Sequence, residues 1–222
     1  MIASLQRLVT ALLDAVLPPH EDVRNARALS IEGLSKLLAP RPVGLSAQAG
    51  TGWIVALFPY LDPRIRALIL AVKYYGETEA LAPVGAILGG YLLEMIGEKE
   101  LLAGWERPLL VPVPPAPQRL RKRGYGQAER IVRAALPTIG SAAEFCPRAL
   151  AREDRESQVK VGRPKRAKNI RGAFRAPDVS LVKGRCVILV DDVAESGSTL
   201  SDARRALFEA GAREVEAVAL AH

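Results

Sequence analysis

The segment from Cys186 to Leu220 constrains the fold more than any other part of the sequence. Its first residues, Cys186 to Val190, form the clearest run of strand-forming residues in the chain, and Asp191-Asp192 and a turn of small residues follow it. A helix is expected from Leu200 to Ala210, because Gly211 can end it, and the next strand from Val215 to Leu220. This strand–helix–strand unit predicts an α/β fold with a parallel sheet flanked by helices, in which ligands bind beyond the carboxyl ends of the strands.

The rest of the chain supplies further elements of such a fold. The continuous apolar run Leu109–Val113 predicts a parallel strand buried on both faces, and Trp53–Phe58 predicts a short strand. Helices are expected from Asp62-Pro63 to about Tyr74, from Glu77 to Gly97 and from Gln127 to Leu136. We expect a basic loop before the last of these helices, and a polar, irregular segment from Arg148 to Phe174.

The N-terminal part of the chain predicts an appendage to this domain. With 222 residues, the chain is long enough for one α/β domain of ordinary size and an additional segment. We expect residues 1–45 to form a helical N-terminal appendage in two pieces, and residues 46–222 to form the domain. The appendage begins with an amphipathic helix whose apolar face consists of Ile2, Leu5, Val9, Leu12, Leu13 and Val16.

Neither the apolar segments nor the cysteines indicate a membrane or a metal centre. The N-terminus lacks the basic start of a signal peptide, and Leu81–Ile96 contains Pro83 and Gly89-Gly90 and is short for a bilayer span. We therefore expect a core helix there and no membrane segment. The two cysteines are far apart, and Cys186 is expected to be a core residue; so few cysteines fit a reducing, cytoplasmic location.

The positive charge of the chain is concentrated in one segment. The net charge is +7, but residues 118–175 contain 16 Lys/Arg and five Asp/Glu, whereas the remainder contains 15 and 19. A local excess of this size attracts phosphates, either of a nucleic acid or of a small phosphorylated molecule. The alternative is a solvated basic loop that binds nothing. Charge alone does not distinguish a nucleic-acid site, a site for a small phosphorylated molecule and such a loop.

The small-residue turn after the acidic pair is a candidate phosphate site. Ser196, Gly197, Ser198 and Thr199 lie where a helix begins, so that several backbone N–H groups and the helix dipole would act on one anion. Gly197 allows close approach of a ligand, and the hydroxyl groups are additional donors. The alternative is that Ser198 or Thr199 is only an N-cap.

The adjacent carboxylates of Asp191 and Asp192 favour a ligand at this turn. Two such groups repel each other unless a cation or hydroxyl donors lie between them, and a vicinal diol with Mg²⁺ supplies both. The order of strand, acidic pair and turn matches a ribose 5-phosphate, with carboxylates for the 2′ and 3′ hydroxyls and amides for the phosphate. The sequence contains neither a P-loop lysine pattern nor a G-x-G-x-x-G that opens a helix after a strand.

These motifs resemble the type I phosphoribosyltransferases, whose signature for phosphoribosyl pyrophosphate (PRPP) is similar to Val187–Thr199. The chain resembles the ComF/GntX branch of this family, which is related to the amidophosphoribosyltransferases, over about residues 60–222. The further matching segments are Leu68-Ile69 through Lys73-Tyr74, Val111-Pro112-Val113-Pro114, Arg119 through Gln127, Gln158, Arg166 with Asn169 to Phe174, Gly211-Ala212 and Val215 to Ala221.

The resemblance implies a role for each matching position. Asp191 and Asp192 would hold the ribose diol and Mg²⁺, and Ser196 to Thr199 would hold the 5-phosphate. Residues 112–127 would be the pyrophosphate loop, and residues 148–174 a mobile hood over the reacting centre. Further candidate substrate contacts are Lys73, Arg119, Arg121 and Arg123.

The chain also departs from the family pattern. The family's N-terminal zinc ribbon is absent, because no cysteine precedes Cys146, so we expect no zinc there. Gly126 replaces the usual Asn, and Ala194-Glu195 replaces a larger residue and Thr. Glu195 occupies the position at which purine phosphoribosyltransferases have an Asp that contacts the base, and it is a candidate acid/base group. The alternative for Glu195 is a solvent-facing acid near a helix start, where acids are favoured.

Two functions follow from this pattern. The first is Mg²⁺-dependent transfer of a phosphoribosyl group from PRPP to a nitrogenous acceptor, with release of pyrophosphate. The second is a non-catalytic accessory protein for competence and DNA uptake that binds single-stranded DNA. Only Tyr125, Phe145 and Phe174 could stack on bases within residues 118–175, which favours the first and leaves weak DNA binding. The resemblance leaves a homodimer open.

Overall fold

The computed structural model describes residues 20–43, 52–74, 79–153 and 172–222. Its centre is a six-stranded sheet in which neighbouring strands are parallel, except for one antiparallel pair at an edge. The expected α/β fold with a parallel sheet is confirmed, and the sheet has an unpredicted strand at each edge. In their order across the sheet the strands are β1 (Arg41–Pro42), β2 (Ile54–Phe58), β8 (Glu214–Ala221), β7 (Cys186–Val193), β3 (Leu109–Pro112) and β4 (Glu144–Phe145).

Strand β7 lies between β3 and β8 and is longer than the sequence predicted. Its residues Cys186–Val190 are buried, as the apolar run indicated. The ladder with β8 continues past this run, because Asp191 pairs with Ala219 and Val193 with Ala221. The acidic pair is therefore part of the strand end, and sheet pairing fixes the direction of its backbone.

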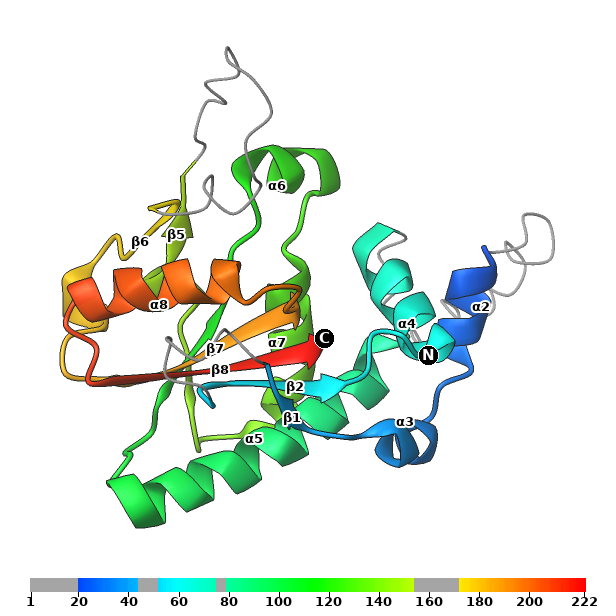
Figure 1. The fold of residues 1–222 in the computed structure, drawn as a ribbon, viewed down its shortest axis with the longest axis horizontal. Helices are drawn as coiled ribbons and strands as arrows, with labels where there is room; N and C mark the ends of the chain where they lie inside the picture. Colours follow the sequence, from blue (N-terminus) through cyan, green and yellow to red (C-terminus); the bar gives the residue numbers. More distant parts are fainter. Residues whose placement is uncertain (1–19, 44–51, 75–78, 154–171) are drawn as a thin grey trace, which may run out of the picture.

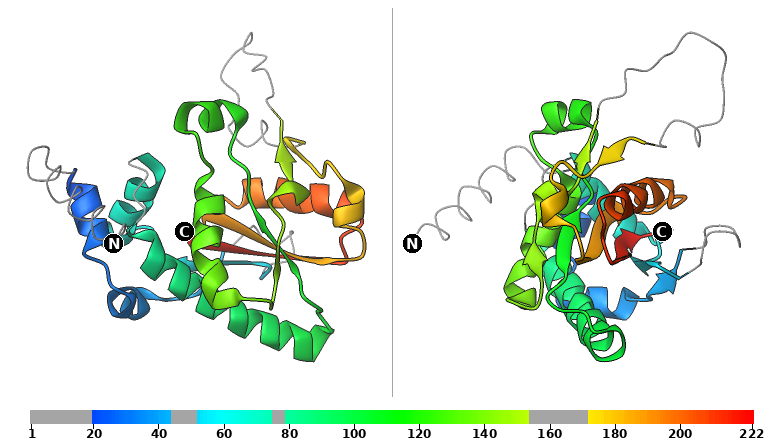
Figure 2. Two further views of the ribbon diagram at one scale, coloured as in Figure 1. Left: turned by 180° about the vertical axis from the view of Figure 1, so that it is seen from behind. Right: turned by 90° about the vertical axis from the view of Figure 1, so that its left-hand side faces the viewer.

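Helices cover both faces of the sheet (Figures 1 and 2). Helix α8 (Ser198–Glu209) packs on one face, and α5 (Leu81–Ala103) and α7 (Gln127–Ile139) cover the other. The side chains of β7 alternate between the two cores, as expected for a strand covered on both sides. Val187 and Leu189 pack beneath α8, whereas Ile188 and Val190 pack beneath α5 and α7.

Helix α5 confirms the expected core helix, although it begins at Leu81 and ends at Ala103. By length and composition it could cross a membrane, and it is the one helix within the described ranges that could. Its core-facing side instead packs against the rest of the domain through Leu81, Val84, Gly85, Leu88, Gly89, Leu92 and Ile96. Pro83 falls in the first turn, where its missing N–H breaks no helical hydrogen bond.

The described part of the N-terminal region packs into the same core. Helices α2 (Glu21–Arg27) and α3 (Ile31–Leu37) bury Val23, Ala26 and Leu34 against α4 (Pro63–Tyr74) and α5. Helix α4 begins at the predicted residue, where Asp62 accepts a hydrogen bond from the backbone N–H of Arg64 at 2.9 Å. The predicted amphipathic helix of residues 1–16 lies outside the described residues, and a boundary at residue 45 stays a prediction.

The segment expected to be irregular contains a short ribbon separate from the main sheet. Strands β5 (Ala151–Arg152) and β6 (Phe174–Arg175) are antiparallel and follow a 3-10 turn at Pro147–Ala149. The prediction of an irregular segment from 148 to 174 is thus wrong at both ends, because backbone pairing there does not depend on apolar periodicity. Residues 154–171, which include most of the predicted hood and the motif residues Gln158, Arg166 and Asn169, lie outside the described residues.

Candidate functional site

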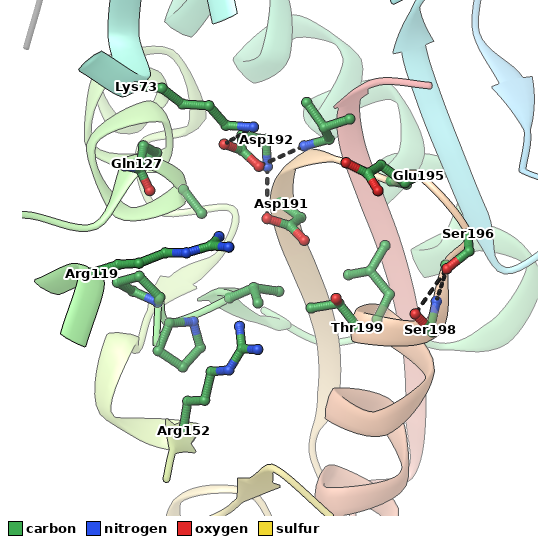
Figure 3. Close-up of a pocket in the computed structure, with 18 of the residues that line it drawn as sticks. Lys73, Arg119, Gln127, Arg152, Asp191, Asp192, Glu195, Ser196, Ser198 and Thr199 are labelled. Carbon is green, nitrogen blue, oxygen red and sulfur yellow. Dashed lines mark hydrogen bonds and ion pairs between the residues drawn. The ribbon is translucent and has the colours of Figure 1, made fainter. Parts of the chain in front are cut away.

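A cavity of about 580 Å³ opens at the carboxyl ends of β3 and β7, where ligands of open α/β sheets bind (Figure 3). Its wall includes ten of the eleven residues that the sequence proposed as site residues. The lining residues are Lys73, Val113, Pro114, Pro115, Arg119, Arg123, Gln127, Ala128, Arg152 and the continuous segment Asp191–Leu200. Segments far apart in the sequence thus converge on one cavity.

The acidic pair lies in the middle of this wall. The Asp191 carboxylate accepts a hydrogen bond from the backbone N–H of Asp192 at 2.9 Å, and the Asp192 carboxylate accepts one from Val193 at 2.7 Å. The Lys73 ammonium, at the end of α4, lies 3.1 Å from the second carboxylate oxygen of Asp192 (Figure 3). Lys73 thus acts as the counter-ion of one member of the pair.

The surroundings of the other member, Asp191, disfavour the negatively charged form of its carboxyl group. Burial raises the pKa of Asp191 well above its usual range, and the negative charge of Asp192 raises it further. The opposing effects of the Asp192 N–H and of Lys73 are smaller. A site with this property favours a proton, a cation or hydroxyl donors beside Asp191.

The small-residue turn lies next to the acidic pair. Gly197 is the N-cap of α8 with φ of +69°, a left-handed conformation that glycine adopts without strain, and α8 begins at Ser198. The Ser196 and Ser198 hydroxyl oxygens are 2.8 Å apart. Because the N-cap is Gly197, the alternative that Ser198 or Thr199 is only an N-cap is wrong. The backbone N–H of Ser198 donates to the Ser196 hydroxyl oxygen at 3.4 Å, whereas the N-cap glycine has no side chain, so the next N–H groups of α8 are available to an anion in the cavity.

The expected basic loop after β3 is a short helix, α6 (Pro117–Arg123). Pro117 favours its first turn, and Gly124, with φ of +79°, ends it. Arg119 and Arg123 lie four residues apart, on one side of this helix, and both line the cavity. Arg121 does not line the cavity, because a residue two positions along a helix points to a different side. The helical backbone thus separates Arg121 from the other two arginines with which the sequence grouped it.

Arg152 of the ribbon is a cavity residue that sequence reasoning missed. Figure 3 shows Arg119 and Arg152 reaching into the cavity from the side opposite Asp191 and Thr199. Burial lowers the pKa of Arg152, and the like charge of Arg119 lowers it further. Two guanidinium groups that repel each other on one side of a cavity are stabilised by an anion between them. No local pattern around Arg152 identifies it among the other arginines of the basic segment.

Gln127, at the start of α7, also points into the cavity (Figure 3). Its side chain is 7% exposed, and its amide nitrogen has no hydrogen-bond partner within the described ranges. The sequence placed Gln127 in the pyrophosphate loop but assigned it no role. A buried amide donor without a partner is costly.

The end of α4 forms the remaining wall. Next to Lys73, the ring of Tyr74 lies 4.8 Å from the guanidinium carbon of Arg123, and the Tyr125 hydroxyl donates to the Val72 carbonyl at 3.3 Å. These contacts tie α6 and the segment after it to α4. Glu195 is exposed at the cavity mouth, a position compatible with either of the roles considered for it.

The cavity therefore has an ordered distribution of charge. Amide and hydroxyl donors of the turn lie at one end, two carboxylates lie in the middle, and Arg119 and Arg152 lie opposite. Within the described parts of the chain, no group of three or more His, Cys, Asp or Glu side chains could hold a metal ion by itself. The arrangement suits a small ligand that carries two separate phosphate groups and neighbouring hydroxyl groups.

Comparison with known proteins gives one family match and several similar structures. Residues 122–222 match the phosphoribosyl transferase domain, and no curated protein matches the chain. Among solved structures, the chain is similar to the glutamine PRPP amidotransferase of B. subtilis, with 17% identity and a TM-score of 0.40 over 68% of this chain and 30% of that one. A hypoxanthine phosphoribosyltransferase from Staphylococcus aureus has 12% identity and a TM-score of 0.38 over 64% and 63% of the two chains.

The orotate phosphoribosyltransferase of Mycobacterium tuberculosis H37Rv has 14% identity and a TM-score of 0.36, and the match covers 90% of this chain and 95% of that one. This chain spans about 30% of the length of the amidotransferase. The family match, by contrast, includes β7, the turn, α8 and β8, the elements that carry the acidic pair. Residues 122–222 of this chain carry a phosphoribosyl transferase domain.

Proposed function

We propose that this protein binds PRPP in the cavity and transfers the phosphoribosyl group to a nitrogenous acceptor, with release of pyrophosphate. The observation that carries the proposal is the order of charge along the cavity wall, with N–H donors, carboxylates and arginines in sequence. PRPP has a 5-phosphate, a ribose diol and a 1-pyrophosphate in the same order. A nucleoside triphosphate would present three phosphates in one row and leave one end of this arrangement unused.

Each part of PRPP has proposed partners. The 5-phosphate accepts hydrogen bonds from the backbone and hydroxyl groups of Ser196–Thr199, and the ribose hydroxyls donate to Asp191 and Asp192. The pyrophosphate lies between Arg119 and Arg152, with Arg123 beside it, and neutralises their mutual repulsion. Lys73 stays close to the pair as a counter-ion of the negatively charged ligand.

The residues present fit a Mg²⁺ ion that is shared with the substrate. Mg²⁺ is usually bound by one or two carboxylates, several water molecules and substrate phosphates, and the acidic pair supplies the carboxylates. Burial and the charge of Asp192 raise the pKa of Asp191, so a cation at this position would stabilise its charged form. When bound, Mg²⁺ would neutralise charge on the pyrophosphate as it leaves.

The proposed reaction exchanges one bond at the anomeric carbon for another. The bond to the pyrophosphate oxygen breaks, and pyrophosphate keeps the electron pair, held by Arg119 and Arg152. A bond from the same carbon to the acceptor nitrogen forms, and that nitrogen loses a proton. Glu195, at the cavity mouth, is the candidate to accept the proton, and a solvent-facing role without chemistry is its alternative.

Calorimetric titration with PRPP, in the presence and absence of Mg²⁺, tests this proposal. In the double variant Asp191→Asn and Asp192→Asn, each lost hydrogen bond to a charged group is worth about 1.5–3 kcal/mol, so we expect at least tenfold weaker binding of PRPP. The matched control is Glu98→Gln with Glu100→Gln, which removes the same charge from exposed positions on α5. Equal affinities of the two double variants would refute the assignment of the site.

The ComF branch and its link to DNA remain part of the proposal as the alternative function. The aromatic rings of the basic segment give this alternative little support, because each already faces an arginine. The guanidinium carbons of Arg130, Arg133 and Arg152 lie 4.6, 4.8 and 5.2 Å from the rings of Tyr125, Phe145 and Phe174. Stacking on nucleic-acid bases would require these rings to be open.

Fluorescence anisotropy with labelled single-stranded DNA separates the two functions. The enzymatic proposal predicts only electrostatic binding of DNA, with a dissociation constant of about 10⁻⁴–10⁻⁶ M at physiological salt. Such binding should weaken as salt rises and should be reduced by PRPP, because both ligands need Arg119 and Arg123. Tighter binding that persists in saturating Mg²⁺ and PRPP would favour the accessory role in DNA uptake.

A further inference from the structure

A buried carboxylate outside the cavity has a set of contacts that the proposed reaction does not use. Asp202, in the second turn of α8, is 5% exposed, and it is not among the residues that line the cavity. Charged side chains are rarely buried to this degree unless they are fully paired. Its position on α8, one turn after the phosphate-binding turn, connects it to the site.

The Asp202 carboxylate accepts hydrogen bonds from three consecutive backbone N–H groups. Gly172 and Ala173 donate at 2.6 and 2.7 Å, and Phe174, the first residue of β6, donates at 3.1 Å. Arg205, one turn further along α8, donates to Asp202 at 3.0 Å and to the Phe174 carbonyl at 3.3 Å. One turn of α8 therefore holds the start of β6.

This attachment contributes to where the ribbon lies. Strands β5 and β6 pair only with each other among the described strands, so no strand pairing with the main sheet positions them, although Leu150, Ala173 and Phe174 are buried in the core beneath α8. In the ribbon, Arg152 pairs with Phe174, and its guanidinium carbon lies 5.2 Å from the Phe174 ring. Glu153 extends the pairing by donating its N–H to the Ala173 carbonyl at 2.9 Å.

We propose that Asp202 is a positioning residue that sets the distance between the 5-phosphate turn and the pyrophosphate-binding Arg152. Helix α8 begins at the turn that would bind the 5-phosphate, and four residues later Asp202 holds the ribbon that carries Arg152. The binding groups for both ends of the ligand are therefore attached to one helix. This inference rests on the proposed function, because it takes Arg152 as a ligand contact. Asp202 acts through Phe174 and Arg152 and does not touch the ligand.

The chemistry of the contact requires a carboxylate. Three N–H groups and a guanidinium converge on the two oxygens, and only a group that accepts on both sides satisfies all four donors. In Asp202→Asn one of these oxygens becomes an NH₂ group that faces other donors. The substitution keeps the size of the side chain and loosens the attachment of residues 172–174.

The test uses calorimetry on the full chain with two separate ligands, pyrophosphate and ribose 5-phosphate, each of which carries one end of PRPP. We expect Asp202→Asn to weaken pyrophosphate binding about tenfold and Arg152→Ala to weaken it by tenfold or more. The dissociation constants of ribose 5-phosphate for the wild type and these two variants should agree within about twofold. The double variant should bind pyrophosphate no more weakly than Arg152→Ala alone, because both act on one contact. Asp178→Asn is the matched control, since Asp178 accepts similar hydrogen bonds from Ser180 at an exposed turn.

Hydrogen exchange provides a readout that does not depend on ligand binding. The amides of residues 172–174 should exchange faster in Asp202→Asn than in the wild type, while those of β7 are unchanged. Pyrophosphate affinity that is unchanged in Asp202→Asn would overturn the inference, as would an equal loss for pyrophosphate and ribose 5-phosphate, which indicates general unfolding. If the wild type binds neither ligand, the proposed function fails, and unchanged exchange at residues 172–174 would then separately refute the attachment.

Discussion

The contact between α5 and α7 allows a quantitative test of how the cavity wall is held. A Cβ atom built on Gly85 would lie 2.2 Å from the Ala134 carbonyl oxygen and 2.4 Å from its carbonyl carbon, both in the backbone of α7. One turn later, a Cβ on Gly89 would lie 2.6 Å from the Thr138 Cβ. These two glycines let α5 and α7 approach closely, and neither clash can be relieved by turning a flexible side chain.

We expect Gly85→Ala to destabilise the protein. Overpacking of this kind costs about 1–3 kcal/mol, and the better helix propensity of alanine offsets roughly 0.5–1 kcal/mol of it. The net loss of up to about 2.5 kcal/mol should lower the melting temperature by roughly 2–4 °C for each kcal/mol in a chain of this size. Because α7 begins at Gln127 in the cavity wall, a displacement of α7 should also weaken PRPP binding.

The same helix contains the matched control. A Cβ on Gly90 meets no atom within 4 Å, so Gly90→Ala gains helix propensity without a clash and should stabilise the protein by up to about 1 kcal/mol. Urea denaturation and thermal melting of the two variants measure the difference directly. If Gly85→Ala is as stable as Gly90→Ala, the close approach of the two helices is wrong.

Three further predictions concern single side chains. Arg119→Ala and Arg123→Ala should each weaken pyrophosphate binding by about tenfold in calorimetry, whereas Arg121→Ala, on another side of α6, should change it less than twofold. Gly197→Ala places a side chain at φ +69°, which costs about 1–2 kcal/mol in denaturation and should weaken ribose 5-phosphate binding. Burial acts to raise the pKa of Asp202, but the hydrogen bonds from Gly172 and Arg205 hold that pKa below its usual value. Its stabilising effect is therefore complete above the unfolded pKa and is lost as pH falls through the folded one, so the stability difference from Asp202→Asn should shrink below about pH 4 in urea titrations.

The parts of the fold that could be predicted are those in which a local pattern determines the structure. The apolar run Cys186–Val190 has only one favourable place, the middle of a sheet covered on both faces, and β7 occupies it. The turn after it could be placed because Gly197 and its hydroxyl neighbours suit a helix start. Asp62-Pro63 located the beginning of α4 for the same reason, since caps are local signals.

The parts that could not be predicted depend on contacts between distant segments. Helix α6 buries none of its residues, so it has no apolar periodicity and resembles a loop in sequence. Arg152 reaches the cavity through pairing with Phe174 and the attachment of β6 to α8, neither of which leaves a pattern in its neighbourhood. The edge strands β1 and β4 have two residues each, too few for any alternation to be recognised.

The pairing of β3 with β7 explains how separate motifs become one site. These strands are far apart in the sequence but adjacent in the sheet, and their register places Pro112 beside Val190. The backbone N–H of Val113 continues the ladder to the Val190 carbonyl at 2.8 Å. Consequently the segment that leads to Arg119 leaves the sheet directly beside Asp191, while the turn that begins α8 follows the acidic pair along the chain. The acidic pair must then lie between the arginines and the phosphate turn, so the sheet register itself determines the order of the three subsites along the proposed ligand.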